Sequence, residues 1–371
     1  MTDINQVKEW RRVFHRYPEV SYAEFETTKR LRNILEEHEI KIVDYPLQTG
    51  LVAEVGQGEE VVALRTDIDA LPILEQVDSE IRSTADGVMH ACGHDIHMAT
   101  ILAATMQLKA REAELPGRVR ILFQAAEEVG SGAQQMVEAG VLDGVKAVTG
   151  FHNDPTLKVG EFAIKSGAMT SAVDRFAIHI QGKGGHAAKP EESNDPMIIL
   201  GQLMTSIQSI VSRNVSAFDS AVVTIGEVSA GNTWNVIPDQ AYMQGTVRTF
   251  NAATRAKAEE RLQDLCAGIA KAFDANIELE YIHLPNAVIN DEALTEKAVE
   301  AAEETGYSVQ ILGEPKTIGE DFSALSDTVP GVFAFIGSES DYDLHHPKYQ
   351  PDERILETAP DYLVKLIQKL F

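Results

Sequence analysis

The fold class is decided by one stretch of the sequence, RVRILFQAAEEVGSGAQQMVEAGVLDGVKAVTGFH, which covers residues 118–152. Arg118–Phe123 is an apolar run of strand length, and Ala147–Phe151 is a second one. Between them, Gly132–Ala139 has the spacing of a short helix. A strand, a helix and a second strand in this order are typical of a βαβ unit. The sequence therefore predicts an α/β fold with a largely parallel sheet.

The chain before this stretch continues the same alternation. We expect a first helix with Asp3 as its N-cap, because Val7, Trp10 and Phe14 are spaced for one face. The further predictions, in chain order, are a helix from about Glu24 to His38, strands at Leu51–Val55 and Val61–Arg65, an irregular stretch to about His90, and a helix from Ile96 to about Ala110.

The pattern changes after Gly167 and returns to the earlier style from about Leu294. The order strand, helix, strand, strand, helix, strand in between suits a small α+β domain with its helices on one sheet face. We therefore predict a larger domain of residues 1–173 and 286–371, with residues 174–285 inserted in it. The predicted elements are Arg175–Gln181, Met197–Ser212, Ala221–Val228, Ala241–Thr249, Ala253–Phe273 and Ile277–Ile282 in the insertion, and Phe333–Ile336 and Pro360–Leu370 after it.

Composition narrows the class of partner. The 371 residues hold 32 Lys and Arg against 57 Asp and Glu, a net charge of −25, which disfavours nucleic acids and anionic membranes as partners. No apolar run approaches the roughly 20 residues of a membrane helix. The start lacks the pattern of a secretory signal, and two cysteines make no disulfide framework. We expect a cytoplasmic protein, with Cys266 in a helical core pattern.

The densest cluster of metal-binding side chains is His90–His97 (HACGHDIH). Cys92 and His94 are separated by one glycine, so both can point at one site from the loop before the next helix. Thiolate and imidazole are ligands for borderline-soft divalent metals. Asp95 or the more distant Asp67 is expected to orient a ligand imidazole.

An acidic pair, Glu127-Glu128, follows the strand Arg118–Phe123. Ligands of open α/β sheets collect at the carboxyl ends of strands, and this pair lies at such an end. Neighbouring residues on a bend point in different directions, so one glutamate can bind metal while the other faces the substrate. A glutamate near a metal can take a proton from water and pass it to a leaving amine.

Histidines follow two further strands. His152 ends the strand after the acidic pair, and His345-His346 comes after Phe333–Ile336. The residues alone leave open which of His345 and His346 is a ligand. Either choice gives five ligands, which exceed one tetrahedral site and suit two ions that share a bridging water.

Eight motifs in order along the chain resemble a known family. The whole chain is similar to the amidohydrolase branch of the aminoacylase/carboxypeptidase-type dinuclear metallopeptidases, which includes bacterial aminoacylases, hippurate hydrolases and auxin-conjugate hydrolases. The motifs are Arg65–Pro72 (RTDIDALP), HACGHDIH, Glu127-Glu128, Gly182–His186 (GKGGH), Asn235–Pro238 (NVIP), Gly245–Arg248 (GTVR), Gly319–Phe322 (GEDF) and Leu344–Pro347 (LHHP).

The resemblance implies a zinc-peptidase-like catalytic domain with an inserted lid domain that forms the contact of a homodimer. It implies two divalent ions, which we expect to be Zn, Mn, Co or Ni, and Glu127 as the general base. The family pattern His-x-Pro selects His345 over His346. The implied metal ligands are Cys92, His94, Glu128, His152 and His345, and Asp67 remains a residue that orients a ligand.

Three residues of the insertion receive roles from the resemblance alone. His186 matches the histidine that stabilises the oxyanion, and Asn235 and Arg248 match residues that hold the substrate. Without the resemblance, His186 is interpreted as a turn residue and Arg248 as a half-exposed strand residue. Glu191 stands where relatives often have a histidine, which puts an inherited substrate preference in doubt.

The expected activity is hydrolysis of an N-acyl amino acid, and first of all an N-acetyl amino acid such as N-acetylcysteine. Alternatives within the branch are N-acetyldiaminopimelate deacetylation and hippurate hydrolysis. A metal-dependent dipeptidase would use the same centre. A non-catalytic relative would be expected to lack Glu127 or a ligand, and all of these positions are filled.

Overall fold

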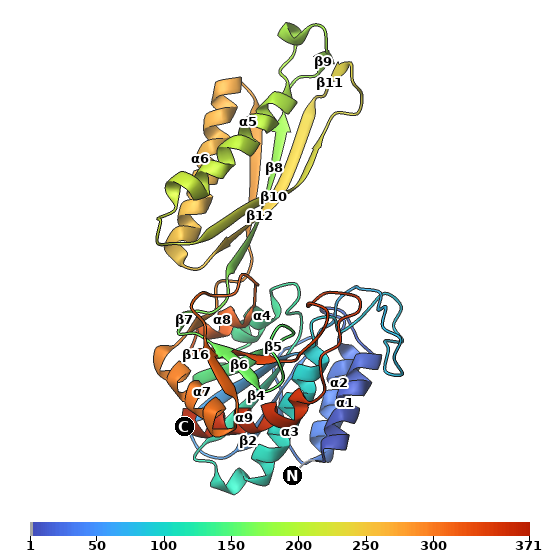
Figure 1. The fold of residues 1–371 in the computed structure, drawn as a ribbon, viewed down its shortest axis with the longest axis vertical. Helices are drawn as coiled ribbons and strands as arrows, with labels where there is room; N and C mark the ends of the chain where they lie inside the picture. The colour runs from blue at the N-terminus through green and yellow to red at the C-terminus, as the bar shows by residue number, and fades with distance from the viewer. Residues whose placement is uncertain (1–2) are drawn as a thin grey trace. The chain divides into compact units, whose positions relative to one another are not determined.

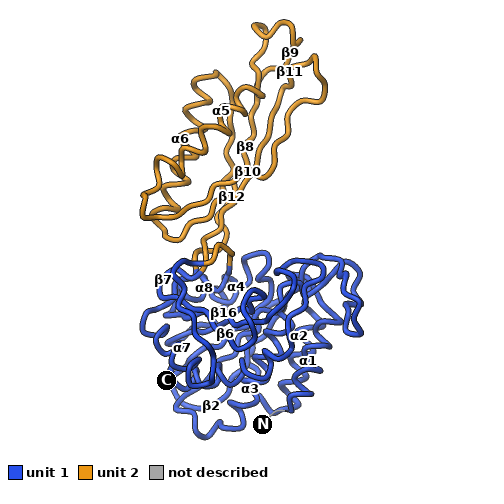
Figure 2. The backbone as a smooth tube through the Cα atoms, viewed as in Figure 1, with its two compact units in different colours: residues 1–169, 288–315, 320–371 blue, residues 170–287, 316–319 orange. Residues whose placement is uncertain are grey.

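The structure is a computed structural model, and it describes residues 3–371. The chain forms two compact units (Figure 2). Unit 1 comprises residues 1–169, 288–315 and 320–371, and unit 2 comprises residues 170–287 and 316–319. The predicted insertion, residues 174–285, lies within unit 2.

Unit 1 is built around an eight-stranded sheet in the order β1-β2-β4-β3-β5-β16-β6-β15 (Figure 1). The four central strands β4, β3, β5 and β16 run parallel, which confirms the α/β class. The strands are β1 (Lys41–Val43), β2 (Leu51–Gly56), β3 (Val61–Asp67), β4 (Arg118–Gln124), β5 (Val145–Asp154), β6 (Glu161–Ile164), β15 (Ser308–Ile311) and β16 (Gly331–Gly337), beside the small pair β7 (Gly167–Ala168) and β14 (Ile289–Asn290).

The sheet is more mixed than the sequence predicts, because β2 is antiparallel to β4 and β6 is antiparallel to β16. The loop between β2 and β3 explains the first case. It covers only residues 57–60, whereas a parallel crossover needs a dozen or more residues. The chain therefore reverses between β2 and β3, and β4 fills the gap between them.

The helices of unit 1 cover both faces of its sheet. Helices α1, α3, α7 and α9 pack together on one face, α4 and α8 pack on each other, and α2 lies against β1 and β2. Gly150 faces Phe322 of α8, while Phe151 lies in the core with α3 and α9, and neighbouring strand residues point to opposite faces. The bounds are α1 (Ile4–Arg16), α2 (Phe25–Glu37), α3 (His94–Ala110), α4 (Gly132–Glu138), α7 (Glu292–Glu304), α8 (Phe322–Ser326) and α9 (Ile355–Leu370), with a 3-10 turn at Glu112–Glu114.

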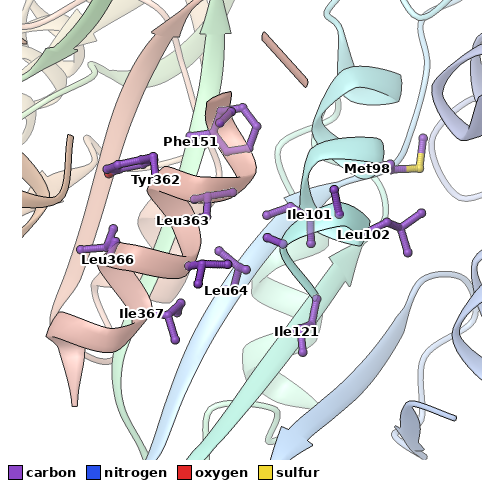
Figure 3. Close-up of a cluster of buried hydrophobic side chains, with 14 of the residues drawn as sticks. Leu64, Met98, Ile101, Leu102, Ile121, Phe151, Tyr362, Leu363, Leu366 and Ile367 are labelled. Carbon is purple, nitrogen blue, oxygen red and sulfur yellow. The ribbon is translucent and has the colours of Figure 1, made fainter. Parts of the chain in front are cut away.

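The main core lies between helices α3 and α9 and the central strands (Figure 3). Ile101 and Leu102 of α3 and Leu363 of α9 are fully buried there, and the burial of each such side chain contributes about 1.5–3 kcal/mol. The predicted cap of α1 is confirmed, because the Asp3 carboxylate accepts from the amide of Asn5. Helix α9 begins at Ile355, earlier than the predicted Pro360, which lies inside the helix.

Unit 2 is a four-stranded antiparallel sheet in the order β10-β12-β8-β13. Helices α5 and α6 pack on each other and on this sheet (Figure 1), which confirms the predicted α+β class. The elements are β8 (Ala172–Gln181), β9 (Gly185–His186), a 3-10 turn at Pro190–Glu192, α5 (Pro196–Ser209), a π-helical turn at Ile210–Asn214, β10 (Ala221–Ala230), β11 (Val236–Ile237), β12 (Gln240–Thr249), α6 (Ala252–Phe273) and β13 (Asn276–His283). Cys266 is buried in the core of this unit, as predicted.

Within residues 3–371, no helix is both long and apolar enough to cross a membrane.

Candidate metal centre

The predicted ligands of unit 1 meet at the carboxyl edge of its central strands. Glu127 and Glu128 follow β4, His152 lies near the end of β5, and His345 follows β16. Cys92 and His94 stand at the start of α3, on the chain that returns from β3. Parallel strands end at one edge of a sheet, and this edge is where open α/β sheets bind ligands.

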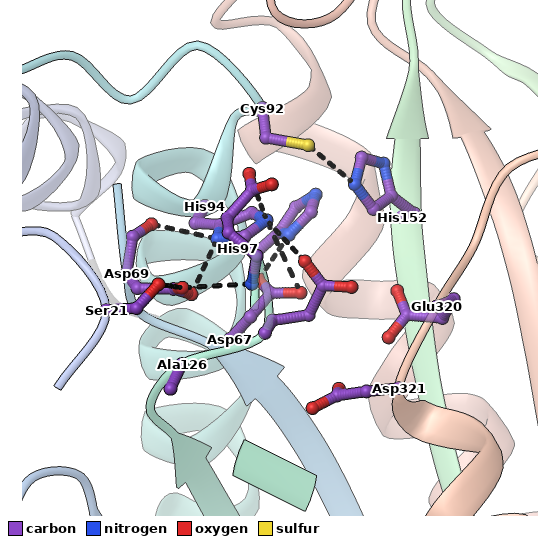
Figure 4. Close-up of polar contacts among 12 residues, drawn as sticks. Ser21, Asp67, Asp69, Cys92, His94, His97, Ala126, His152, Glu320 and Asp321 are labelled. Carbon is purple, nitrogen blue, oxygen red and sulfur yellow. Dashed lines mark hydrogen bonds and ion pairs between the residues drawn. The ribbon is translucent and has the colours of Figure 1, made fainter. Parts of the chain in front are cut away.

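Gly93 lets the loop pass close to β5. Its φ is +90°, and a Cβ at this position would lie 2.5 Å from the Asn153 amide nitrogen. The Asn153 side chain donates to the carbonyl of Cys92 at 2.7 Å. The Cys92 sulfur then lies 3.3 Å from Nε2 of His152 (Figure 4).

A tight turn after β4 directs the two glutamates into the same space. Ala126 has a φ of +55°, a left-handed conformation that is uncommon outside glycine. Glu127 Oε2 and Glu128 Oε1 lie 3.9 Å and 3.8 Å from Nε2 of His94. The second oxygen of Glu128 lies 3.6 Å from Nε2 of His345.

The structure separates the two neighbouring histidines after β16. His345 has a φ of +65°, and its amide donates to the carbonyl of Ala91. Its imidazole faces Glu128. His346 instead stacks on the ring of Tyr342, with ring centroids 4.4 Å apart. Only His345 therefore takes part in the cluster.

The donor atoms of the cluster fit divalent cations. Cys92, His94 and His152 form one triad, and Cys92, Glu128 and His345 form another, each with its ligand atoms within 4.8 Å of one another. Nε2 of His94 and Oε1 of Glu128 are buried and have no hydrogen-bond partner among the described residues. Buried polar atoms without partners are costly, and a bound cation would satisfy both.

Backbone and carboxylate groups orient the imidazoles. Nδ1 of His94 lies 2.9 Å from the carbonyl oxygen of Asp69, and Nδ1 of His152 lies 2.7 Å from the carbonyl oxygen of Asn153. These contacts leave Nε2 of both rings to face the centre. Such outer contacts set the tautomer and direction of metal-binding histidines.

The carboxylate of Asp67 lies near the predicted ligand His94, with 3.8 Å between Oδ2 and Nε2. Its carboxylate also lies 2.6 Å from Nδ1 of His97 (Figure 4). Nε2 of His97 accepts from the amide of Asn153. Both nitrogens of His97 are thus occupied. Asp67 therefore orients His97 directly while it also lies beside His94, and its role in orienting a ligand stays a prediction. Asp95, the other residue considered for this role, pairs with Arg11 and His15 instead.

A buried arginine network beside the centre was not predicted from the sequence. The Arg65 guanidinium lies 2.9 Å from Asp67, 3.0 Å from Glu320 and 2.8 Å from Asp321. Asp321 also accepts from the side chain of Gln124 at the end of β4. The motifs around Arg65 and Glu320 carry the family resemblance, but nothing in their spacing indicates this contact.

The electrostatics of the centre favour cations. Burial, reinforced by the neighbouring carboxylates of Glu320, Glu128 and Asp321, raises the pKa of Glu127 well above its usual range. Burial likewise raises the pKa of Glu128 to about 7. Burial also raises the pKa of the Cys92 thiol, further supported by the charge of Glu128. A cation at this position would stabilise the charged form of all three groups.

The remaining predicted residues lie in unit 2. His186 in β9 pairs with Val236 of β11 and is exposed, and the Asn235 carbonyl accepts from the amide of Ala187. Arg248 in β12 is half-buried and donates to the hydroxyl of Thr246. Burial lowers the pKa of Arg248. Their roles in the reaction remain predictions.

Comparison with known proteins identifies the family. The sequence pattern of peptidase family M20/M25/M40 matches residues 63–369. N-acetylcysteine deacetylase of Bacillus subtilis (strain 168) is 46% identical over 359 residues, which cover 96% of this chain and 94% of that protein. N-acetyldiaminopimelate deacetylase of the same organism is 36% identical over 354 residues, with 94% of each chain covered.

A solved structure shows the same fold. The crystal structure of a Bacillus subtilis protein described as a dinuclear metal-binding peptidase of the M20 family has a TM-score of 0.88 and 41% identity, and the match covers 99% of this chain and 98% of that one. The chain belongs to peptidase family M20/M25/M40. It is a hydrolase that acts on amide C–N bonds.

Proposed function

We propose that this protein is a metal-dependent amidohydrolase that releases the acyl group, and preferably the acetyl group, from N-acyl amino acids. The observation that carries the proposal is the pair of ligand triads that share Cys92, with Glu127 directly beside them. The similarity to two bacterial deacetylases of amino-acid derivatives supports the choice of substrate class.

Two ions would divide the ligands between them. Cys92, His94 and His152 would hold one ion, and Cys92, Glu128 and His345 would hold the other. Cysteine, histidine and carboxylate ligands accept Zn, Mn, Co or Ni. When bound, such ions lower the pKa of water and polarise the substrate carbonyl.

Glu127 moves the protons of the reaction. Its carboxylate takes a proton from the attacking water, and the same carboxyl group then protonates the leaving nitrogen so that the amide bond breaks. Asp69 and Asn153 keep the ligand imidazoles in place. The products are a carboxylate and a free amino acid.

Residues of unit 2 complete the proposal on the basis of the family resemblance. His186 donates a hydrogen bond to the oxyanion, and a preorganised donor of this kind strengthens as charge develops in the transition state. Asn235 and Arg248 hold the carboxylate or amide of the substrate. The cytoplasmic location predicted from the sequence also remains a prediction.

A substrate panel on metal-reconstituted protein tests the proposed function. We expect N-acetylcysteine and other N-acetyl amino acids to be hydrolysed with a higher kcat/KM than N-acetyldiaminopimelate, hippurate or dipeptides. Each substrate is assayed by the release of free amine after reconstitution with Mn²⁺ or Zn²⁺. Efficient cleavage of dipeptides without deacetylation would replace the proposal by a dipeptidase, and absence of all amide hydrolysis would refute it.

The protein is further proposed to form a homodimer through unit 2. Within the described residues, strand β10 pairs with β12 alone and is therefore an edge of its sheet. Unpaired edges can pair with a strand of another chain. Val222 and Val228 on β10 and Met197 and Ile198 on the neighbouring α5 are exposed.

Light scattering measures the mass of this assembly directly. We expect twice the 40.6 kDa of one chain, and the chain mass alone for a Val222→Lys/Val228→Lys double variant, because charged side chains at the edge oppose pairing. A monomeric unaltered protein would contradict the dimer.

A further inference from the structure

The turn that carries Glu127 and Glu128 is held in an uncommon conformation. Ala126, the residue before Glu127, has a φ of +55°. Gly132 crosses so close to the turn that a Cβ there would lie 1.6 Å from the carbonyl oxygen of Ala125. Left-handed non-glycine residues persist only where surrounding structure holds them. The contacts of this turn therefore decide the direction of both glutamates.

Glu24 supplies a contact to the strained residue itself. Its side chain is fully buried, and its Oε1 accepts from the amide of Ala126 at 2.9 Å. The other oxygen accepts from the hydroxyl of Thr49 at 2.8 Å. Glu24 stands at the N-cap position of α2, yet its side chain makes no capping hydrogen bond there. The Glu24 carboxylate thus accepts a hydrogen bond from the turn and does not cap its own helix.

Two neighbours of Glu24 reach the same turn. The Ser21 hydroxyl donates to Asp69 at 2.7 Å, and the same Asp69 oxygen accepts from the amide of Glu128 at 3.0 Å (Figure 4). The Tyr22 hydroxyl pairs with that of Ser131, at the start of α4. The segment Ser21–Glu24 thus contacts the turn before and after the glutamate pair, and it reaches the amide of Glu128 through Asp69.

We infer that Glu24 is a positioning residue that directs Glu127 and Glu128 into the metal centre by accepting the Ala126 amide. The inference rests on the proposed function. Its physical basis is that a buried amide needs an acceptor, so the loss of Glu24 would turn Ala126 toward another partner and rotate the following residues. A displacement of about 1 Å at a reacting group can lower the rate about 10²-fold.

Two substitutions of Glu24 distinguish a role in positioning the turn from a role in filling buried space. Glu24→Gln keeps an oxygen for the Ala126 amide, and its NH₂ group can donate to the Thr49 hydroxyl, which can also accept. Glu24→Met fills a similar volume but offers no such acceptor. Glu54, a buried carboxylate of β2 that pairs with Arg120, provides the control Glu54→Met for general destabilisation.

The experiment measures kcat, KM, Co²⁺ affinity by calorimetry on metal-free protein, and Tm. For Glu24→Met we expect kcat to fall about 10²-fold and Co²⁺ affinity to fall about 10–100-fold, with KM little changed. Glu24→Gln is expected to stay close to the unaltered protein. Glu54→Met is expected to lower Tm while leaving kcat and Co²⁺ affinity unchanged.

A double variant tests the strained residue directly. Glycine adopts positive φ readily, so an Ala126→Gly background should reduce the loss that Glu24→Met causes. The inference is overturned if Glu24→Met keeps its kcat and Co²⁺ affinity, if Glu24→Gln loses as much as Glu24→Met, or if Glu54→Met produces the same losses. If the unaltered protein binds no Co²⁺, the proposed function itself is wrong, and the inference fails with it.

Discussion

Glu127→Gln is expected to lower kcat by about 10²–10⁴-fold, the usual contribution of a general acid–base group. Glutamine matches glutamate in size but cannot accept a proton from water. The bound metal should persist, because Glu128 and not Glu127 completes the triad with Cys92 and His345. Steady-state kinetics together with metal analysis of the same sample measure both effects.

Glu128→Gln is the matched control, since it alters the neighbouring carboxylate on the same turn. We expect it to lower metal content as well as kcat, because the Glu128 carboxylate lies within reach of both His94 and His345. The assigned roles would be wrong if Glu127→Gln kept full activity. They would be reversed if Glu127→Gln lost the metal and Glu128→Gln retained it.

Removal of metal is expected to abolish hydrolysis and to lower Tm. The centre gathers the carboxylates of Glu127, Glu128 and Asp67 around His94, and without a cation these like charges repel. A ligand that binds only the folded state stabilises it by about 2.7 kcal/mol at a concentration 100 times its Kd. Thermal unfolding and activity, each followed before and after dialysis against a chelator, measure the two effects.

The restoration of metal binding and activity to the metal-free protein should depend on pH. Burial raises the pKa of the Cys92 thiol, and a metal binds the thiolate, so binding must release this proton. Reloading with Mn²⁺ or Zn²⁺ should accordingly be tighter at higher pH and weaken as the pH falls. Full activity after complete metal removal, verified by elemental analysis, would exclude metal-dependent hydrolysis.

The local sequence pattern was sufficient to predict the fold class and the edge of the sheet at which the site lies. The alternation around Arg118–Phe123 predicted the α/β class, which the central parallel strands confirm. The strand-end positions of Glu127 and His152 predicted that their side chains would gather at one sheet edge, since parallel strands end together. The structure places both residues there, although their catalytic and ligand roles stay predictions.

Contacts between segments far apart in the chain could not be predicted from the local sequence pattern. Three contacts illustrate this. The carbonyl oxygen of Asp69 contacts Nδ1 of His94, and the carboxylate of Asp67 contacts Nδ1 of His97. The Arg65 guanidinium donates to Asp321, which lies 256 positions further along the chain. The spacing of residues along a strand or helix predicts which face they share, but it carries no information on which distant backbone atom lies opposite them.

The sequence by itself determined the class of chemistry, because thiol, imidazole and carboxylate groups keep their affinity for metals wherever they stand. It also predicted the order of most of the longer strands and helices, because periodicity is a local property, but not the short strands β1, β6 and β15. Only the tertiary structure decided that Glu24 accepts the amide of Ala126. Residue spacing left His345 and His346 open, the family pattern selected His345, and the tertiary structure places the His345 imidazole opposite Glu128. Both depend on backbone torsions and long-range packing, which no spacing along the chain encodes.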